Sequence, residues 1–413
     1  MTSAPTRVAF LRPRLGIGGS ERLVTDAAVA LSQRGYNVTM FVPDRLDVAQ
    51  FPGLAEHGIE TKRAGAFLPN DIAGRLRAPL AIARTAWAAW KLSRHPKQPS
   101  LILCDVVPHV IPWLKRRIPA PVLYYCHYPD LLLTRAEDRH SPVYQAYREP
   151  IDRSEERGLR SADVVVTNSR YTAEIVRHTF PQLSGAQMRV LYPGVACPAQ
   201  CPEPPTAVAD GEIVLLSVNR FDPRKNLLLA VDALDALRRR LNPALFSRVR
   251  LVMAGYYDQR LAEVVQVVEG LRRRAAELNL LDRLDLRFSP TDDERTALLA
   301  DARCVVYTPE AEHFGYVPIE AMAAGRAVIA VGHGGPAETV VHGSTGLLCE
   351  PTADAFAAAM AIMVESVDTA AHMGRAGYAH VSSHFSIERF GDTLEEVVSG
   401  LIASHKKRRG QRE

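Results

Sequence analysis

Short apolar runs alternate with helix-like patterns twice along the chain, and this alternation constrains the fold more than any other feature. In the first half the apolar runs lie at residues 8–11, 38–42, 101–104, 122–126 and 164–167. In the second half they lie at residues 213–218, 250–254, 284–288, 304–307 and 328–331. Such alternation is typical of parallel strands joined by helices that cover both faces of a sheet. We therefore expect an α/β protein with two Rossmann-like domains that face a central cleft.

A proline-rich segment at residues 197–212 interrupts the alternation and predicts a linker between the two domains. The length of 413 residues also exceeds what one hydrophobic core usually supports. We predict an N-terminal domain over residues 1–196 and a C-terminal domain over residues 213–385. A last helical pattern at 386–404 has no strand after it, so we expect this helix to cross back onto the N-terminal domain.

The formal net charge of +4 belongs to the end of the chain, because residues 405–413 contain five Lys and Arg and one Glu. The rest of the chain is therefore neutral, and we expect no nucleic-acid-binding face. The basic tail suits either attraction to anionic lipid or a solvated, disordered segment. No apolar run approaches the length of a membrane span. The six cysteines are scattered without metal-ligand spacing, so we expect no metal site and a reducing compartment.

The segment at residues 78–92 is rich in alanine and carries Trp87 and Trp90. We favour a helix that packs within the N-terminal domain. The alternative is a helix that lies in a membrane interface, since Trp beside Arg84 and Lys91 suits the headgroup zone.

Two glutamates eight positions apart, Glu312 and Glu320, enclose the most informative motif. The motif follows an apolar run and leads into a predicted helix, so it lies at the carboxyl end of a strand, where open α/β sheets bind ligands. The backbone N–H groups of Gly315, Tyr316 and Val317 would begin the helix and form an anion site.

Three further segments follow predicted strands. Gly18 and Gly19 form a glycine loop before a predicted helix, and glycines let backbone approach a phosphate closely. Arg220 and Lys225 follow the first strand of the second domain and could clamp a pyrophosphate. His127 follows a strand of the first domain. Each of these segments could equally be an ordinary loop when taken alone.

A fourth segment, residues 332–338, reads Gly-His-Gly-Gly-Pro-Ala-Glu and predicts either a flexible loop at the same cleft or a plain turn. Carboxylates beside unpaired amides suit a ligand with both phosphate and hydroxyl groups, such as a nucleotide sugar. The chain has no Asp-x-Asp triplet, which could hold a metal ion on the pyrophosphate of such a ligand. Negative charge on a departing pyrophosphate must then be met by Arg, Lys and helix amides.

These motifs resemble glycosyltransferase family 4, whose members are retaining enzymes with the GT-B fold. Within that family the chain is similar to the α-1,3/1,6-mannosyltransferases of asparagine-linked glycosylation. The resemblance extends over about residues 7–395, and its narrower segments are 18–24, 125–134, 190–193, 219–227 and 307–315.

The resemblance implies a role for each matching residue. Arg220 and Lys225 would hold the donor pyrophosphate, while Glu320 would hold the ribose and Glu312 the mannose. His127 would lie beside the reacting sugar, and Gly18 and Gly19 would approach the donor phosphates. The catalytic set would be His127, Glu312, Arg220 and Lys225, the donor set would add Gly18, Gly19, Gly315, Tyr316, Val317 and Glu320, and the acceptor would meet Glu21, Tyr128 and Asp130.

The resemblance also implies the substrates and the place of action. The donor would be GDP-mannose, bound by the C-terminal domain without a metal or other cofactor. The acceptor, bound by the N-terminal domain, would be chitobiose with one mannose on dolichol pyrophosphate, extended by an α-1,3 and then an α-1,6 mannose. The enzyme would lie peripherally on the cytosolic face of the endoplasmic reticulum, or of the cytoplasmic membrane in a prokaryote, with other transferases of the pathway as partners.

Three alternatives remain open at this stage. A different family 4 transferase would use another lipid or a glycan as acceptor, and the short 78–92 segment is compatible with another polyprenyl carrier. A nicotinamide-dependent dehydrogenase also has Rossmann-like halves, although the Gly-x-Gly-x-x-Gly fingerprint is missing here. A non-catalytic scaffold would not need the intact charged motifs.

Overall fold

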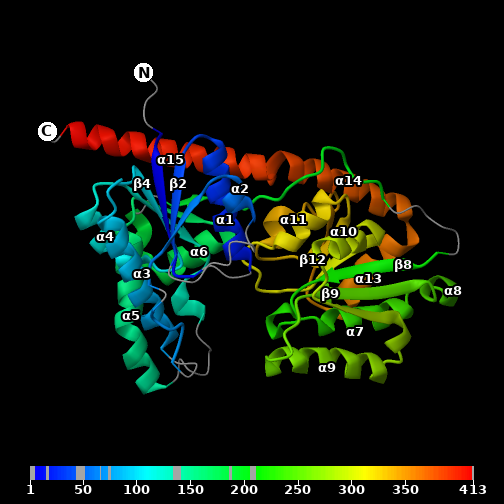
Figure 1. The fold of residues 1–413 in the computed structure, drawn as a ribbon. Helices are drawn as coiled ribbons and strands as arrows, with labels where there is room; N and C mark the ends of the chain where they lie inside the picture. Colours follow the sequence, from blue (N-terminus) through cyan, green and yellow to red (C-terminus); the bar gives the residue numbers. More distant parts are fainter. Residues whose placement is uncertain are drawn as a thin grey trace. The chain divides into compact units, whose positions relative to one another are not determined.

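The structure is a computed structural model that describes residues 5–14, 18–42, 52–65, 67–72, 76–133, 141–185, 188–204 and 211–411. The chain divides into two compact units. Unit 1 comprises Met1–Gly194 together with Ile387–Glu413, and unit 2 comprises Val195–Ser386. Figure 1 shows the ribbon of both units, coloured along the sequence.

Unit 1 is built on a parallel sheet of seven strands in the order β3-β2-β1-β4-β5-β6-β7. The strands are β1 (Arg7–Leu11), β2 (Asn37–Val42), β3 (Glu60–Arg63), β4 (Leu101–Asp105), β5 (Val122–Cys126), β6 (Val164–Thr167) and β7 (Met188–Val190). The chain starts at β1, moves outward to β3, and then returns to β4 on the other side of β1. Loops diverge at such a reversal, and here it falls at the carboxyl ends of β1 and β4.

Helices cover both faces of this sheet. The helices are α1 (Gly19–Gln33), α2 (Pro52–Glu56), α3 (Arg77–Ser93), α4 (Ile111–Arg117), α5 (Pro142–Ser161), α6 (Arg170–Thr179) and α15 (Ile387–Gly410). Strand residues alternate between two cores, with Val8 and Phe10 facing one side and Ala9 and Leu11 the other. The first core is shared with α1, α2 and α15, and the second with α3 to α6.

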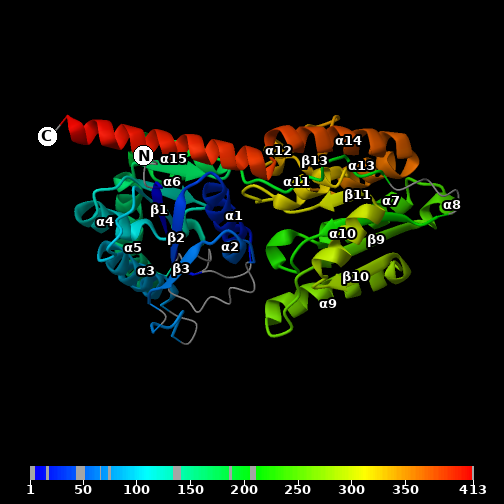
Figure 2. The ribbon, with the colours of Figure 1, turned by 45° about the horizontal axis from the view of Figure 1, so that its top comes forward.

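The last helix confirms that the chain crosses back to the first domain (Figures 1 and 2). Phe390, Leu394 and Val398 of α15 are buried in the core that contains Val8 and Phe10. The helix is longer than predicted, because it continues to Gly410 through most of the expected basic tail. Lys, Arg and His at the carboxyl end of a helix favour this extension, since their charge complements the helix dipole.

Unit 2 has a parallel sheet of six strands in the order β10-β9-β8-β11-β12-β13. The strands are β8 (Ile213–Val218), β9 (Val249–Gly255), β10 (Leu284–Phe288), β11 (Ala302–Tyr307), β12 (Ala327–Val331) and β13 (Gly346–Cys349). The helices are α7 (Leu228–Arg238), α8 (Pro243–Phe246), α9 (Ala262–Glu277), α10 (Asp292–Asp301), α11 (Tyr316–Ala323), α12 (Pro336–Thr339), α13 (Ala353–Glu365) and α14 (Val367–His384). Here the order reverses between β8 and β11.

Two sequence predictions can be compared directly with these elements. The helix predicted at 78–92 is α3, and Ala88, Ala89 and Leu92 bury it against the unit 1 sheet. Arg84 is buried and hydrogen-bonded to Asn70, so it does not have the headgroup exposure considered for it. Among the described residues no helix is long and apolar enough to cross a membrane.

The segment predicted as a linker is attached to unit 2 in its described part. The carbonyl oxygen of Pro198 accepts a hydrogen bond of 2.5 Å from Tyr378, and that of Glu203 accepts one of 2.6 Å from Arg326. The predicted boundary at 196 lies two residues beyond the boundary between the units. The six residues 205–210 of the predicted linker lie outside the described residues.

Candidate functional site

The reversal of strand order in unit 2 brings two predicted site residues together. Lys225 lies in the loop after β8, and its Nζ is 2.6 Å from Oε2 of Glu312, which lies in the loop after β11. The hydroxyl of Tyr307, the last residue of β11, donates to the same oxygen at 2.6 Å. The hydroxyl of Thr308 donates to the carbonyl oxygen of Lys225 at 2.9 Å, which holds the two loops against each other.

Both members of this ion pair keep contact with solvent, since Lys225 is 20% exposed and Glu312 is 18% exposed. Burial would raise the pKa of Glu312, but the ammonium of Lys225 and the hydroxyl of Tyr307 outweigh it and hold that pKa below its ordinary value. Burial, reinforced by the charge of Glu312, raises the pKa of Tyr307 well above its ordinary value. The site therefore holds an ionised carboxylate between two donors.

The amino end of α11 lies directly beyond this carboxylate. Gly315 precedes the helix with a φ of 84°, in the left-handed region where glycine is favoured. Gly315 has no side chain to cap this helix end, which begins with the N–H groups of Tyr316 and Val317. Such a helix end attracts anions, in particular phosphate.

The glycine-rich segment after β12 supports the same loop through its backbone. The N–H of Gly335 donates to the carbonyl oxygen of Glu312 at 2.8 Å. A Cβ on Gly334 would lie 2.6 Å from that oxygen, and a Cβ on Gly335 would lie 2.2 Å from the backbone of Phe314. Glycine is therefore required here for close approach, and of the two interpretations of this segment the one that places it at the site is supported.

Unlike Lys225, Arg220 does not pair with the carboxylate of Glu312. Arg220 is largely exposed, and its guanidinium lies 3.6 Å from Asp222. Hydrogen bonds from Arg224 and the charge of both arginines hold the pKa of Asp222 at about 2, although burial opposes them. Arg220 thus remains a solvent-facing cation near the end of β8.

Glu320 lies one turn into α11 and forms an ion pair with Arg295 of α10. The sequence prediction placed Glu320 at a ribose but gave it no partner. A ribose hydroxyl at Glu320 would therefore meet a carboxylate that a guanidinium already orients.

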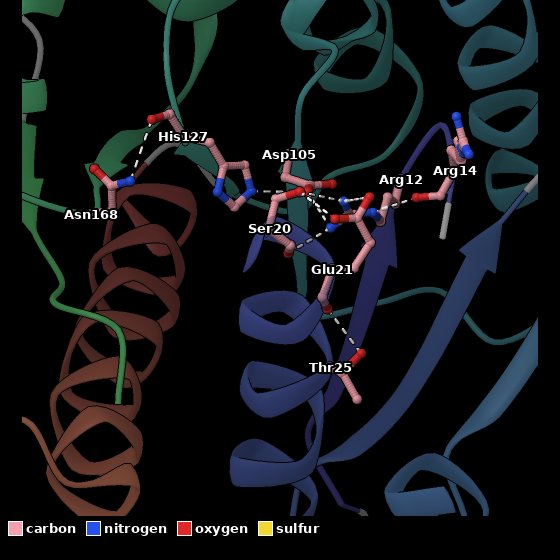
Figure 3. Close-up of polar contacts among 8 residues, drawn as sticks. All are labelled: Arg12, Arg14, Ser20, Glu21, Thr25, Asp105, His127 and Asn168. Atoms are coloured by element: carbon pink, nitrogen blue, oxygen red, sulfur yellow. Dashed lines mark hydrogen bonds and ion pairs between the residues drawn. The ribbon is translucent and has the colours of Figure 1, made fainter. Parts of the chain in front are cut away.

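Unit 1 gathers a second charged cluster, at its own reversal of strand order (Figure 3). Arg12 follows β1 and is 2% exposed, and Asp105 ends β4 and is 1% exposed. Their Nη1 and Oδ2 atoms are 2.7 Å apart. The same guanidinium lies 3.2 Å from a carboxylate oxygen of Glu21 and donates to the carbonyl oxygen of Ser20 at 2.9 Å.

This cluster contains two residues that the sequence analysis had assigned to different roles. Glu21 belongs to the glycine loop, and His127 follows β5 with its Nε2 3.2 Å from Oδ2 of Asp105. Gly18 and Gly19 lie at the start of α1, beside Glu21. Residues 15–17, which precede these glycines, lie outside the described residues.

The predicted acceptor residues Tyr128 and Asp130 lie in the segment after His127. Asp130 pairs with Arg148 of α5 at 2.8 Å, and its N–H donates to Glu155 at 2.7 Å. Burial raises the pKa of Glu155 to about 7, against the opposing effect of its backbone hydrogen bonds. Asp130 is therefore anchored to α5, and Tyr128 is partly exposed.

The sequence analysis missed Arg12 and Asp105, although a signal existed. On one face of the sheet the strands present Val8 and Phe10, then Leu101 and Leu103, then Leu123 and Tyr125. The next position on that face is Arg12, Asp105 or His127, respectively. Side chains two positions apart share a face of a strand, so three polar residues at the carboxyl ends of adjacent strands had to meet.

Comparison with known proteins defines the class first. Residues 17–197 match the family described as Glycosyltransferase Family 4, and residues 203–380 match Glycosyl transferases group 1. Sucrose-phosphate synthase from Thermosynechococcus elongatus is similar in fold, with a TM-score of 0.75 and 25% identity over 97% of this chain and 100% of that one. The protein is thus a glycosyltransferase whose two Rossmann-like domains are those of the GT-B fold, as predicted.

Curated relatives narrow the class to one family. The chain is 38% identical to the α-1,3/1,6-mannosyltransferase ALG2 of Mus musculus over 96% of both chains. It is 37% identical to that of Homo sapiens over 96% of both chains, and 31% identical to that of Saccharomyces cerevisiae over 97% of this chain and 86% of that one. The chain belongs to this family of α-1,3/1,6-mannosyltransferases, so it is an enzyme that takes a nucleotide-sugar donor and a glycan acceptor.

Proposed function

We propose that the protein transfers mannose from GDP-mannose to a polyprenyl pyrophosphate that carries chitobiose with one mannose. It would add an α-1,3 and then an α-1,6 mannose in the assembly of the N-glycan precursor. The observation that carries this proposal is the pairing of Lys225 with Glu312 beside the amino end of α11. This ion pair occurs in a chain that is similar to the mannosyltransferases over nearly its whole length.

Donor binding would use the charges of unit 2. The diphosphate would lie at the amino end of α11, where the N–H groups of Tyr316 and Val317 and the ammonium of Lys225 supply positive charge. Arg220 is exposed and could swing its guanidinium onto the same diphosphate. Glu320, oriented by Arg295, would accept from the ribose hydroxyls.

The mannose would be held by Glu312. Lys225 and Tyr307 both donate to its Oε2, and its Oε1 could accept from a sugar hydroxyl. Glu312 is ionised and held by two donors, which suits it to bind hydroxyls rather than to attack carbon. Gly18 and Gly19 of unit 1 would approach the donor phosphates, and His127 would lie beside the reacting sugar.

Transfer with retention would proceed on one face of the sugar. The bond between C1 of mannose and the phosphate oxygen breaks, and its electron pair leaves with GDP. The acceptor hydroxyl oxygen forms the new bond to C1 and gives its proton to the departing phosphate, as the sugar passes through an oxocarbenium-like state. Lys225, Arg220 and the helix amides stabilise the charge that develops on the phosphate.

The remaining expectations belong to this proposal. No metal ion or other cofactor would be needed, because cationic side chains and amides would meet the leaving charge. Glu21, Tyr128 and Asp130 would contact the acceptor in unit 1. A lipid acceptor would require the enzyme to work at a membrane surface, on the cytosolic side of the endoplasmic reticulum or of a prokaryotic cytoplasmic membrane, alongside other transferases of the pathway.

The test is to incubate the purified protein with GDP-mannose and a synthetic pyrophosphate lipid that bears mannosyl-chitobiose, with and without EDTA. Mass spectrometry should show a gain of two hexoses that EDTA does not change. A gain of one hexose would support mannose transfer but contradict the second linkage. Inhibition by EDTA would overturn the metal-independent mechanism.

Parallel reactions with other nucleotide sugars and with acceptors on other polyprenyl chains test the specificity. Release of GDP without transfer would support the proposed donor site and contradict the proposed acceptor. Preference for a donor other than GDP-mannose would overturn the proposal.

A further inference from the structure

The carboxylate of Asp105 is the most deeply buried charge near His127, and its surroundings determine what it can do. Arg12 and His127 both approach Oδ2, at 2.7 and 3.2 Å. Its Oδ1 is buried, and no partner is found for it among the described residues. At 1% exposure Asp105 cannot touch a substrate, so any contribution to the reaction must pass through the residues that it holds.

The backbone immediately after Asp105 is strained, which is an independent observation. Val106 has a φ of 63°, a left-handed conformation that β-branched residues rarely adopt. The N–H of Val107 donates to the carbonyl oxygen of Asp105 at 2.6 Å, and this i to i+2 bond closes a γ-turn with Val106 at its centre. The Val106 side chain is 41% exposed, so its own packing does not compensate for the strain.

The surrounding structure holds this turn in place from both sides. On one side Asp105 pairs in register with Tyr125 of β5, two residues before His127. On the other side Gly158 of α5 lies so close to Pro108 that a Cβ would be 2.2 Å from the Pro108 carbonyl oxygen. Strain that persists under such constraints is concentrated at functional sites.

An ionised carboxylate can only accept hydrogen bonds, so a ring nitrogen that bonds to it must carry a proton. The carboxylate of Asp105 accepts from the guanidinium of Arg12, and Nε2 of His127 is the ring atom that faces the same oxygen (Figure 3). In a neutral imidazole, a proton on Nε2 leaves Nδ1 as an acceptor.

We propose that Asp105, oriented by Arg12 and by the turn at Val106, is a positioning residue that holds His127 in the Nε2–H tautomer. The ring then presents Nδ1 as a fixed acceptor for a hydroxyl of the reacting sugar. This inference rests on the proposed function for its catalytic consequence, but the tautomer itself can be observed without any substrate.

The first experiment is nitrogen NMR of the full chain labelled with 15N-histidine, with a His127→Gln variant to assign the ring signals. The wild-type ring should show a protonated Nε2 and an unprotonated Nδ1, and Asp105→Ala should mix the two tautomers. A protonated Nδ1 in the wild type, or an unchanged pattern in Asp105→Ala, would overturn the inference even if no transfer activity were found.

The second experiment is kinetic and separates positioning from folding. Misplacement of a reacting group typically costs on the order of 10²-fold in rate, so kcat of Asp105→Ala should fall by about that factor while KM for the donor changes less than about twofold. Val106→Gly relieves the strained turn and should lower kcat about tenfold without lowering the thermal midpoint, so it serves where Asp105→Ala does not fold.

Asp163→Asn is the matched control, since Asp163 lies at the amino end of β6 and binds Lys115 at 2.9 Å. It should keep the wild-type kcat. A wild type that is inactive with every nucleotide sugar refutes the proposed function, whereas an active wild type with an unaffected Asp105→Ala variant refutes the positioning role.

Discussion

The two units place an ion pair at the same point of the same topology, and the two pairs differ in burial. In both sheets the strand order reverses beside the first strand, between β1 and β4 in unit 1 and between β8 and β11 in unit 2. In each unit a cationic side chain after the first strand pairs with a carboxylate at the end of the adjacent strand or in the loop after it. In unit 1, Arg12 and Asp105 are 2% and 1% exposed. In unit 2, Lys225 and Glu312 are 20% and 18% exposed.

The difference shows that the shared topology determines where the ion pair lies, but burial determines what the pair can do. A buried pair orders its own surroundings and has no room for a ligand, so the cluster in unit 1 organises three loops. A partly exposed pair beside glycine backbone and a helix end can exchange its contacts for those of a substrate. We therefore expect substitutions in unit 1 to affect stability first, and those in unit 2 to affect activity first.

The largest expected effect is on the stability of unit 1. Replacing Arg12 by Met removes one partner of a buried pair and should cost about 3–5 kcal/mol, because Asp105 is left buried with an uncompensated charge. Glu312→Gln, at the exposed pair, should cost at most about 1 kcal/mol. Urea unfolding of the full chain measures both, and equal costs would remove the distinction between the two pairs.

Activity should show the reverse order. Lys225→Ala and Glu312→Ala should each lower kcat by about 10²–10³-fold, as is usual when one stabilising group is lost. The double variant should lose much less than the product of the two, because the residues act as one unit. Glu269→Ala, on the exposed side of α9, is the control, and near-normal turnover in either single variant would contradict the assignment.

A smaller effect is expected for two glycines, and it should distinguish the close backbone approach at Glu312 from backbone strain alone. Gly334 and Gly343 have similar positive φ values of 70° and 76°, but only Gly334 lies against the carbonyl oxygen of Glu312. Alanine at either position should cost about 1–3 kcal/mol from strain.

Only Gly334→Ala should also lower kcat, by roughly tenfold, because it displaces Glu312. The readouts are thermal midpoints and initial rates for the two variants. Equal activity in both would mean that the glycine segment does not position the carboxylate.

The smallest expected effect concerns pH. The folded pKa of Glu312 lies below its ordinary value, so the stabilisation from its pairing is complete above the unfolded pKa of about 4.3 and is lost as pH falls through the folded pKa. The difference in unfolding free energy between wild type and Glu312→Gln is at most about 1 kcal/mol. It should therefore shrink between pH 6 and pH 3, which the thermal midpoints of the two proteins measure. Divergence on acidification would reverse the sign of this interaction.

Apolar runs of four or more residues predicted most strands of the two sheets, whereas β3, β7 and β13 were not predicted. β3 reads Glu-Thr-Lys-Arg and lies at the edge of its sheet, so no apolar run marks it. The motif from Glu312 to Glu320 could be singled out because its residues are close in sequence. Arg12 and Asp105 are 93 positions apart, and Arg295 and Glu320 lie on different helices, so only the fold brings them together.

The crossing of α15 has a consequence for the order in which the chain can mature on the ribosome. Unit 1 is synthesised first, yet part of its core comes from Phe390, Leu394 and Val398, near the end of the chain. The intervening 195–386 can close around its own sheet before that helix is available. The first domain to be translated is therefore the last to be finished, and a nascent chain stopped short of α15 leaves an apolar face of unit 1 uncovered for chaperones to recognise.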